Sequence, residues 1–426
     1  MTLLTKIKMT TILDDNLEIL LEELSLDKDL FQTSNDEPTP LELCKEMINC
    51  IPNEWWEKKR DSFTILDPCA GFGNFMICLF KKLQTQYSNK TILEDIFNFN
   101  EINRDRISYI NSIFMSDTFN LNITNEDFLE YPEDILYDLQ IVNPPFAKFH
   151  EVREGDKVTL KRSSKNHTLV RDFIKKSLDT CKDGGIIAYV VPNNWMSLAD
   201  RNTLVKELTG YQFHKLAIQT PKKFFPKIGS SFTYFILEKT PFYKDYTVDC
   251  LYNKKLYSSF VKSSIRDFIP LLYTKETQSI LQKILSGEKK FNILTSSDLH
   301  RYTKTKLISN EKDDEFKFKL HHTDKQTVWA NRPHKFQDGW KVFLNLTGKW
   351  NLFIDDCGMT QSIAFIICKN KREANKIMNT LNEPIYKFVS DMCRWGNFNN
   401  IRILQRLSSN FKLSEEEKLF MDENCH

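Results

Sequence analysis

Short apolar runs alternate with helical stretches from about residue 36 to residue 240. Runs too short to be helices, separated by segments with helical periodicity, are typical of a parallel α/β sheet whose strands are joined by crossover helices. Seven runs have the length and composition of strands: 63–67, 94–102, 120–124, 139–143, 185–191, 213–219 and 231–238. The pattern therefore predicts an α/β domain built on a seven-stranded sheet.

Amphipathic stretches at 73–87 and 103–114 are the predicted crossover helices of this sheet. Residues 10–32 carry leucine and isoleucine at helical spacing among acidic side chains, which predicts an amphipathic helix. We therefore expect an N-terminal helical segment at 1–35, followed by the α/β domain at 36–242.

Beyond Pro241 the alternation gives way to aromatic-rich sequence, with a charged stretch at 311–319 and a helical run at 370–393. Residues 243–426 are therefore predicted to form a mixed α+β C-terminal domain. A chain of 426 residues is long enough for two domains with separate cores.

The composition, with 41% hydrophobic and 27% charged residues and a formal net charge of +2, is that of a soluble globular protein. Acidic residues are concentrated in the first forty positions, so the remainder is basic, which suits a polyanionic partner but also fits ordinary solvated charge. The ten cysteines form no CxxC pair or Cys/His cluster, which argues against a metal and favours a reducing, cytoplasmic compartment. Without a signal peptide or a long apolar run, we expect no membrane association.

The motif NPPF, formed by Asn143, Pro144, Pro145 and Phe146, stands at the end of the fourth predicted strand. A polar residue, two prolines and an aromatic ring make a stiff, shallow shelf where open α/β sheets bind ligands. A proline-containing turn between a strand and a helix is the alternative interpretation.

Such a shelf suits methylation of a purine amino group, which is a poor nucleophile because its lone pair is delocalised into the ring. The Asn143 side-chain oxygen and the Pro144 carbonyl can each accept an amino proton and aim the lone pair at an electrophilic methyl group. Phe146 can stack on the base, a contact worth about 1–3 kcal/mol that helps to hold a nucleotide swung out of a duplex.

A second motif, ILDPCAGFGN, is an apolar strand that ends in Asp67 and Pro68 and opens into a loop with Ala70, Gly71 and Gly73. The glycines permit a cofactor to approach the backbone, and the next helix directs its N-terminus at the charged part of that cofactor. The spacing differs from GxGxxG, which disfavours a dinucleotide.

Together, DPCAGFGN and NPPF resemble the motifs of adenine-specific (N6) DNA methyltransferases of restriction-modification type, which have the class I S-adenosylmethionine-dependent methyltransferase fold. The motif order, with a large trailing region, resembles the gamma arrangement. The resemblance covers residues 36–242 well and the rest loosely. It implies a Rossmann-like seven-stranded sheet, S-adenosyl-L-methionine as cofactor, a flipped adenine in double-stranded DNA as substrate, and a target recognition domain at 243–426. It leaves room for a cognate restriction endonuclease encoded separately.

The resemblance assigns catalysis to the NPPF residues, and cofactor contacts to Asn143 and to Asp67, Pro68, Ala70, Gly71 and Gly73. Thr39 and Pro40 resemble the motif that contacts the methionine part of the cofactor, although a helix start capped by Thr39 fits them equally. Glu101 stands where the family has an acid that binds the ribose hydroxyls, with an ordinary exposed acid as the alternative.

Asp127 and Phe128 resemble the motif that meets the cofactor adenine, with helix capping by Asp127 as the competing account. Phe225, with Phe224 beside it, resembles the late aromatic that packs on the target adenine. Trp195 follows the fifth strand, where it would line the same cleft. Core packing is the alternative for each ring, since the chain has 32 phenylalanines.

Basic residues flank the predicted site. Lys222, Lys223 and Lys227 surround the late phenylalanines without a nearby acid, which predicts positive charge beside the flipped base. The lysine- and arginine-rich segment 148–176 would form a loop that closes over nucleic acid. In the predicted C-terminal domain, aromatic and basic residues interleave from 329 to 395, which suits phosphate contact and base reading, or packing.

Three other functions remain open from the sequence: RNA adenine methylation, glutamine methylation in a protein, and a binding subunit without turnover. The intact motifs argue against a binding subunit without turnover, and the basic flanks disfavour glutamine methylation. The recognised DNA site and the oligomeric state do not follow from the sequence.

Overall fold

The computed structural model describes residues 2–26, 38–59, 62–146, 149–154, 157–162, 169–199, 203–225 and 231–425. The chain divides into two compact units. The first takes in Met1–Trp195, Thr203–Leu251 and Ser258–Arg266, and the second takes in Met196–Asn202, Tyr252–Tyr257 and Asp267–His426. None of the described helices has the length and apolar character needed to cross a bilayer.

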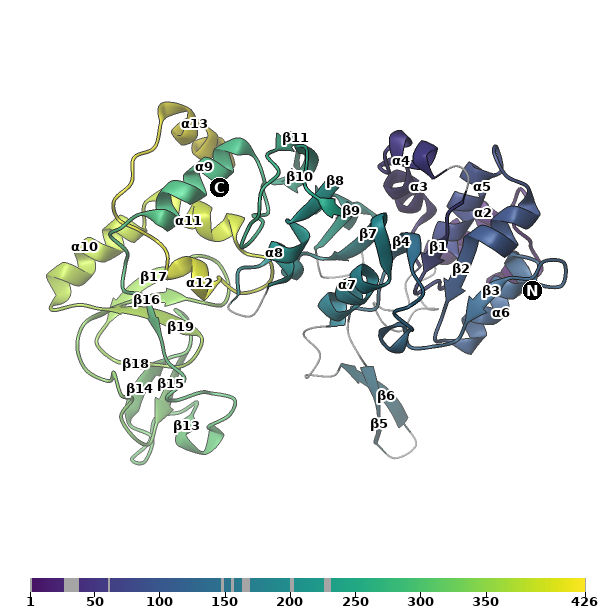
Figure 1. Ribbon diagram of the computed structural model, residues 1–426. Helices are drawn as coiled ribbons and strands as arrows, with labels where there is room; N and C mark the ends of the chain where they lie inside the picture. The colour runs from purple at the N-terminus through teal and green to yellow at the C-terminus, as the bar shows by residue number, and fades with distance from the viewer. Residues whose placement is uncertain are drawn as a thin grey trace. The chain divides into compact units, whose positions relative to one another are not determined.

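The first unit is built on a nine-stranded sheet with the order β11-β10-β8-β9-β7-β4-β1-β2-β3 (Figure 1). Strands β3, β2, β1, β4 and β7 are parallel, and β9 runs antiparallel between β7 and β8. The strands are β1 (Ile65–Asp67), β2 (Phe97–Asn100), β3 (Asn122–Thr124), β4 (Tyr137–Val142), β7 (Cys181–Pro192), β8 (Tyr211–Ile218), β9 (Phe232–Pro241), β10 (Tyr246–Tyr252) and β11 (Lys255–Val261). All seven predicted strands are present, but the sheet has nine, because β10 and β11 continue it beyond residue 242.

Helices cover both faces of this sheet, as expected for a doubly wound fold. Alternate residues of the central strands, such as Ile186, Ala188 and Val190, belong to one apolar core with the N-terminal helices. The intervening Tyr189 faces the opposite side, where its hydroxyl donates to the Phe173 carbonyl of α7 at 3.0 Å. The helices are α1 (Leu3–Lys8), α2 (Leu17–Leu26), α3 (Leu41–Asn49), α4 (Asn53–Lys58), α5 (Asn74–Leu83), α6 (Arg104–Ile113), α7 (Leu169–Asp179) and α8 (Leu204–Leu208).

The amphipathic helix predicted at residues 10–32 begins later in the structure. Helix α2 begins at Leu17, and the Ile12 amide before it donates to the Ile113 carbonyl at the end of α6 at 2.7 Å. This contact joins the N-terminal segment to the rest of the first unit. Residues 27–32 of the predicted helix lie outside the described residues, as do parts of the basic segment 148–176 around the hairpin of β5 (Phe149–Glu154) and β6 (Lys157–Arg162).

The second unit is mixed α+β, with two four-stranded sheets ordered β12-β19-β16-β17 and β13-β15-β14-β18. The helical run predicted at 370–393 is two helices, because Pro384 cannot continue α10 and begins a new helix instead. The strands of the second unit are β12 (Leu294–Thr295), β13 (Ile308–Ser309), β14 (Phe318–His321), β15 (Thr327–Ala330), β16 (Lys341–Asn345), β17 (Leu352–Asp355), β18 (Gly358–Met359) and β19 (Ile363–Ile367). Its helices are α9 (Lys275–Ser286), α10 (Lys371–Leu381), α11 (Pro384–Met392), α12 (Ile401–Leu404) and α13 (Glu415–Asn424).

A buried carboxylate anchors the amino end of β4. Asp138 is 2% exposed and accepts from Lys59 at 2.7 Å, from Lys182 at 2.6 Å and from the Thr64 amide at 3.0 Å. Burial alone would raise the pKa of Asp138, but these hydrogen bonds hold it below its ordinary value of 3.8. The stabilisation is therefore present above that value and is lost as the pH falls through the lowered pKa of the folded state.

We predict that Asp138→Asn lowers the free energy of unfolding at neutral pH by about 1–3 kcal/mol. The loss should shrink at acidic pH, where the wild-type carboxyl is protonated as well. Urea titrations at several pH values measure this. Asp183→Asn is the matched control, because Asp183 is 96% exposed and lies 3.7 Å from Lys239. An equal loss in both variants would contradict the assignment.

Candidate active site at the carboxyl edge of the sheet

Three parallel strands of the first unit end side by side. Strand β1 ends at Asp67, which is paired with Phe99 of β2, and Leu66 of β1 is paired with Gln140 of β4. Glu101 directly follows β2, and Asn143 directly follows β4. Because parallel strands point the same way, these three side chains belong to one edge of the sheet, where α/β folds bind ligands.

The loop after β1 is fixed by its own backbone. The Cys69 amide donates to the Asp67 carboxylate at 3.1 Å, and the Gly73 amide donates to the Ala70 carbonyl at 2.7 Å. Gly71 and Gly73 have φ values of +58° and +80°, in the left-handed region that favours glycine. Gly73 is also the N-cap of α5, so the loop leads directly into a helix N-terminus.

Glu101 is 4% exposed and lies against the glycine loop. One carboxylate oxygen accepts from the Gly71 amide at 2.8 Å, and the other accepts from the Asn103 amide at 2.8 Å. The interpretation of Glu101 as an ordinary exposed acid is therefore wrong. Each oxygen retains a second lone pair, so the carboxylate can still accept from a ligand.

Asn100, which sequence analysis missed, ties two loops of this edge together. Its side-chain nitrogen donates to the Pro68 carbonyl and to the Glu126 carbonyl, both at 3.1 Å. Its side-chain oxygen accepts from the Thr124 hydroxyl at 2.8 Å. The position of Asn100 next to Glu101, at a strand end, could have indicated its role from the sequence.

Thr39 and Pro40 lie beside the same loop. Pro40, rather than Thr39, is the N-cap of α3, and no side chain caps this helix. The Thr39 carbonyl accepts from the Asn74 side chain at 2.7 Å, which links the start of α3 to the start of α5. The other amide atom of Asn74, Oδ1, is buried and has no partner among the described residues. Asn74 belongs to the quoted DPCAGFGN motif but was not predicted as a site residue.

Asp127 and Phe128 follow β3 at the same end of the sheet. Asp127 caps the short 3-10 helix η2 (Phe128–Glu130), since its side chain accepts from the Leu129 amide at 3.1 Å. Phe128 is 2% exposed and packs on Phe173 of α7 with ring centroids 5.7 Å apart. The capping interpretation therefore describes Asp127, and the Phe128 ring is largely occupied by core packing.

The NPPF segment leaves the end of β4 with a buried, unpaired acceptor. Pro144 is buried, whereas Asn143, Pro145 and Phe146 are half-buried. The Oδ1 atom of Asn143 is shielded from solvent and accepts no hydrogen bond from the described residues. An orphaned buried acceptor of this kind is costly unless a ligand supplies the donor.

The aromatic residues predicted for the target side come together around Phe232. Its ring centroid lies 5.2 Å from that of Phe146 and 5.0 Å from that of Phe225. Phe225 is only 1% exposed, whereas Phe224 is half-buried. Trp195 is 2% exposed and packs on Phe235, so its ring belongs to the core.

The lysines beside these rings have an acidic neighbour, contrary to the prediction. Lys223 lies 3.6 Å from Glu46 of α3, which is distant in sequence and was therefore not visible in the local pattern. Lys222 donates to the Phe225 carbonyl at 3.2 Å. Lys227 lies outside the described residues.

Burial sets the charge state of the Asp67 carboxyl. This side chain is 1% exposed, and burial, with a smaller contribution from the charge of Glu101, raises its pKa from 3.8 to about 8. The folded state therefore holds the Asp67 proton more tightly than the unfolded chain does. As the pH rises from the unfolded to the folded value, this group progressively opposes folding.

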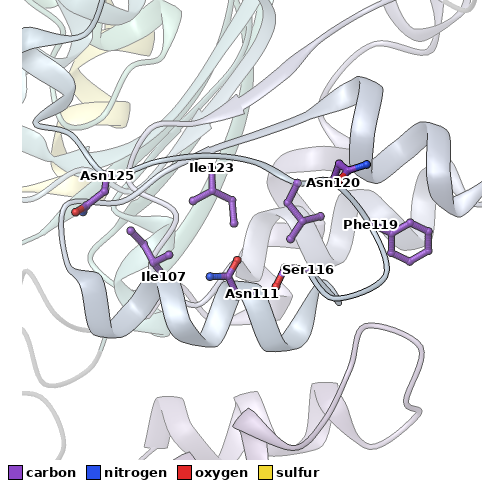
Figure 2. Close-up of a pocket in the computed structure, with 8 residues that line it drawn as sticks. Ile107, Asn111, Ser116, Phe119, Asn120, Ile123 and Asn125 are labelled. Carbon is purple, nitrogen blue, oxygen red and sulfur yellow. The ribbon is translucent and has the colours of Figure 1, made fainter.

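A separate cavity of about 480 Å³ lies between α6 and the segment that leads into β3 (Figure 2). Uncharged side chains line it, among them Ile107, Asn111 and Phe119. None of the predicted site residues that the structure describes lines it. The cavity is thus distinct from the edge that carries Asp67 and Asn143.

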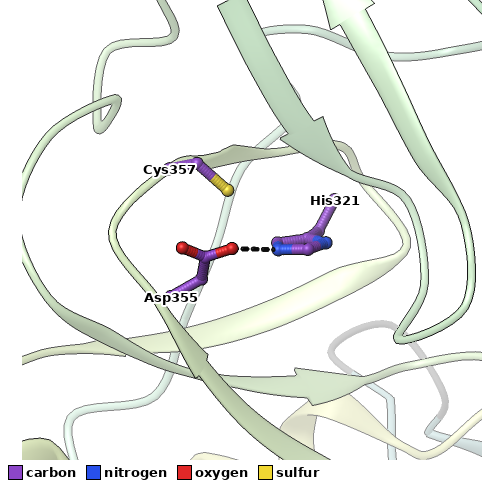
Figure 3. Close-up of side chains that lie close together, drawn as sticks. All are labelled: His321, Asp355 and Cys357. Carbon is purple, nitrogen blue, oxygen red and sulfur yellow. Dashed lines mark hydrogen bonds and ion pairs between the residues drawn. The ribbon is translucent and has the colours of Figure 1, made fainter.

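In the second unit, His321, Asp355 and Cys357 converge so that their potential metal-binding atoms lie within 4.8 Å of one another (Figure 3). These three residues are not grouped in the sequence, because only the fold brings them together. His321 Nε2 lies 2.8 Å from Asp355, whose carboxylate also accepts from Lys319 at 2.6 Å. Burial, with the charge of Asp355, raises the pKa of the Cys357 thiol to about 12. A lysine-neutralised carboxylate and a protonated thiol make this a hydrogen-bonded cluster, and we assign no metal to it.

The sheet, its glycine loop and the motif after β4 define a class I S-adenosylmethionine-dependent methyltransferase fold. The sequence profile of the N-6 DNA methylase family matches residues 12–267, which is more than half of the chain. The protein therefore belongs to the N-6 DNA methylase family, whose members use S-adenosylmethionine.

Two solved structures share the fold with TM-scores above 0.5. The matched protein chain of a DrdV–DNA complex is 12% identical in sequence to this chain. Its TM-score is 0.55, and the match covers 96% of this chain and 59% of that chain. The type IIL restriction-modification enzyme MmeI in complex with DNA is also 12% identical, with a TM-score of 0.52 over 94% of this chain and 69% of that chain. A type I restriction-modification protein of 16% identity has a TM-score of 0.42 over 55% of this chain, which spans 47% of that protein's length. No curated protein matches the sequence.

The residues present fit the cofactor of this family. S-adenosylmethionine offers hydrogen-bond donors in its ammonium group, its ribose hydroxyls and its adenine amino group. The carboxyl edge offers acceptors in the Glu101 and Asp127 carboxylates and in Asn74 Oδ1, which has no partner in the part of the chain that the structure describes. The left-handed glycines leave the loop backbone open to close approach.

We predict that Gly73→Ala destabilises the protein by about 2–4 kcal/mol. A Cβ atom there would lie 2.6 Å from Phe114, a buried ring that packs on Phe99 and cannot easily move. Gly184→Ala is the control, since its φ of +71° is similar but no atom lies within 4 Å of the added Cβ. Thermal unfolding compares the two, and equal shifts would refute the role of Phe114.

We also predict that Asp67→Asn flattens the pH dependence of stability between about pH 4 and pH 8 in the cofactor-free protein. The wild type should lose stability across this range as Asp67 ionises, and the amide variant should not lose that contribution. Chemical denaturation at several pH values measures the slopes. A wild-type slope retained in the variant would show that Asp67 does not carry it.

Proposed function

We propose that the protein is a site-specific DNA methyltransferase that transfers a methyl group from S-adenosylmethionine to the exocyclic N6 of a flipped adenine. The observation that carries the proposal is Asn143 Oδ1, which is buried without a hydrogen-bond partner among the described residues, at the sheet edge that also holds the glycine loop. An adenine amino group supplies the donor that this acceptor lacks. The family match at residues 12–267 and the DNA-bound fold relatives support nucleic acid as the substrate.

In the proposed mechanism, Asn143 Oδ1 and the Pro144 carbonyl accept the two N6 protons. These hydrogen bonds pull the nitrogen toward tetrahedral geometry and direct its lone pair at the methyl group that the cofactor supplies. Phe146, which rests on Phe232, stacks on the base. The methylated nitrogen is positively charged and strongly acidic, so water removes its proton without a side-chain base.

On the cofactor side, the loop residues Asp67, Pro68, Ala70, Gly71 and Gly73, together with Thr39 and Pro40, would hold the methionine part, and Glu101 would accept from the ribose hydroxyls. Asp127 and Phe128 would meet the adenine at its edge, since the Phe128 ring already packs on Phe173. Among the late aromatics, Phe224 suits the target base better than Phe225, because Phe225 is 1% exposed. The second unit would read the DNA sequence, and a separately encoded endonuclease would be its partner in restriction.

We predict that Asn143→Ala lowers the single-turnover rate of methyl transfer to DNA by about a hundred- to a thousandfold, as the loss of a transition-state hydrogen bond does. Cofactor binding, measured by calorimetry, should survive. Asn143→Asp keeps an acceptor oxygen and should retain part of the rate.

Undiminished methylation by Asn143→Ala would refute the catalytic assignment. Asp67→Asn distinguishes cofactor binding from catalysis, because this variant should weaken cofactor binding in the same calorimetric assay. Structured RNA offered beside duplex DNA tests the substrate, and faster methylation of the RNA would overturn the choice of DNA.

A further inference from the structure

Glu46, in the middle of α3, joins the cofactor side of the first unit to its target side. One carboxylate oxygen accepts from the Tyr234 hydroxyl of β9 at 2.9 Å. The other lies 3.6 Å from the Lys223 ammonium in the 3-10 helix η4 (Thr220–Phe224). We call Glu46, Lys223, Phe224 and Tyr234 the Glu46 clasp.

The Tyr234 end of the clasp is rigid. Tyr234 is 1% exposed, and β9 is paired on both sides, with β7 and with β8. Its hydroxyl also lies 3.6 Å from the Cys50 sulfur. Glu46 therefore keeps a fixed position whether or not Lys223 is paired with it.

The ion pair at the Lys223 end of the clasp can be replaced. The Lys223 side chain is 60% exposed, and its 3.6 Å separation from Glu46 is longer than a strong charge-assisted hydrogen bond. Exposed ion pairs of this kind contribute little to stability and are screened by salt. Another anion that reaches Lys223 can replace Glu46 at low cost.

The same ammonium covers an aromatic ring. Lys223 Nζ lies 4.4 Å from the centroid of Phe224, over the ring. Phe224 is half-buried, whereas its neighbour Phe225 is in the core. Phe224 is thus the late aromatic with ring surface to offer, and Lys223 lies over one face of it.

We propose that Glu46 stands in for a DNA phosphate in the free protein, holding Lys223 over Phe224 until a backbone phosphate of bound duplex DNA takes the lysine and uncovers the ring. The inference rests on the proposed function and adds an order of events to it: backbone binding precedes stacking on Phe224. Glu46 is then a positioning residue that touches neither base nor cofactor. The exchange is ionic, so no covalent bond changes.

The test uses Glu46→Gln, which keeps an oxygen acceptor for Tyr234 but removes the charge that competes for Lys223. The probe is a labelled duplex of arbitrary sequence, titrated with the full chain over a series of salt concentrations. Glu46→Gln should bind about two- to fivefold more tightly at low salt. Lys223→Met should reduce the slope of log Kd against log salt by about 0.9, the contribution of one phosphate contact. In the Lys223→Met background, Glu46→Gln should have no effect.

Glu94→Gln is the matched control, because it removes one negative charge from a partly buried glutamate that pairs with exposed Lys90 at 3.9 Å, and it should leave binding unchanged. Unchanged affinity in Glu46→Gln, or the same gain without Lys223, would overturn the clasp while leaving the proposed function intact. A wild type that binds no duplex DNA would reject both. Thermal unfolding of each variant detects a purely structural effect, and the Lys223→Met slope stays decisive if Glu46→Gln unfolds.

Discussion

The side chain of Asn100 holds the carboxyl edge of the sheet together. Buried at the end of β2, it bonds to the Pro68 carbonyl in the loop after β1 and to the Glu126 carbonyl in the loop after β3. An amide that satisfies both neighbours removes their freedom to move apart. Glu101, the next residue, accepts a hydrogen bond from the Gly71 amide. The glycine loop therefore keeps one shape beside Asn143.

This rigid edge carries acceptors that the fold itself does not satisfy. Asn74 Oδ1 and Asn143 Oδ1 are both buried and accept no hydrogen bond from the described residues. Each such atom costs about 1–3 kcal/mol of folding free energy. Stability given up in this way is typical of sites prepared for a ligand, because a donor arriving from outside recovers it. The proposed chemistry needs the same property: acceptors held in place before the amino group arrives.

The sequence predicts the sheet better than it predicts the contacts between segments. Strand ends and glycines are local features, so β1, β4 and the motifs that follow them were found. Strands β10 and β11 were missed because the alternation with helices stops before them, although the sheet continues. The Glu46–Lys223 pair joins residues far apart in sequence, and the local pattern had suggested lysines without an acid. Burial of Phe225 beside half-buried Phe224 likewise depends on tertiary packing, which periodicity cannot distinguish between adjacent phenylalanines.

A crystal structure of the protein with S-adenosylmethionine is the decisive measurement, because it shows whether the loop after β1 and the motif after β4 share one ligand site. We expect cofactor density along the carboxyl ends of β1, β2 and β3, in contact with Glu101 and Gly71, with the methyl group facing Asn143 Oδ1. Density in the cavity beside Asn111, or a methyl group directed away from Asn143, would contradict a shared ligand site.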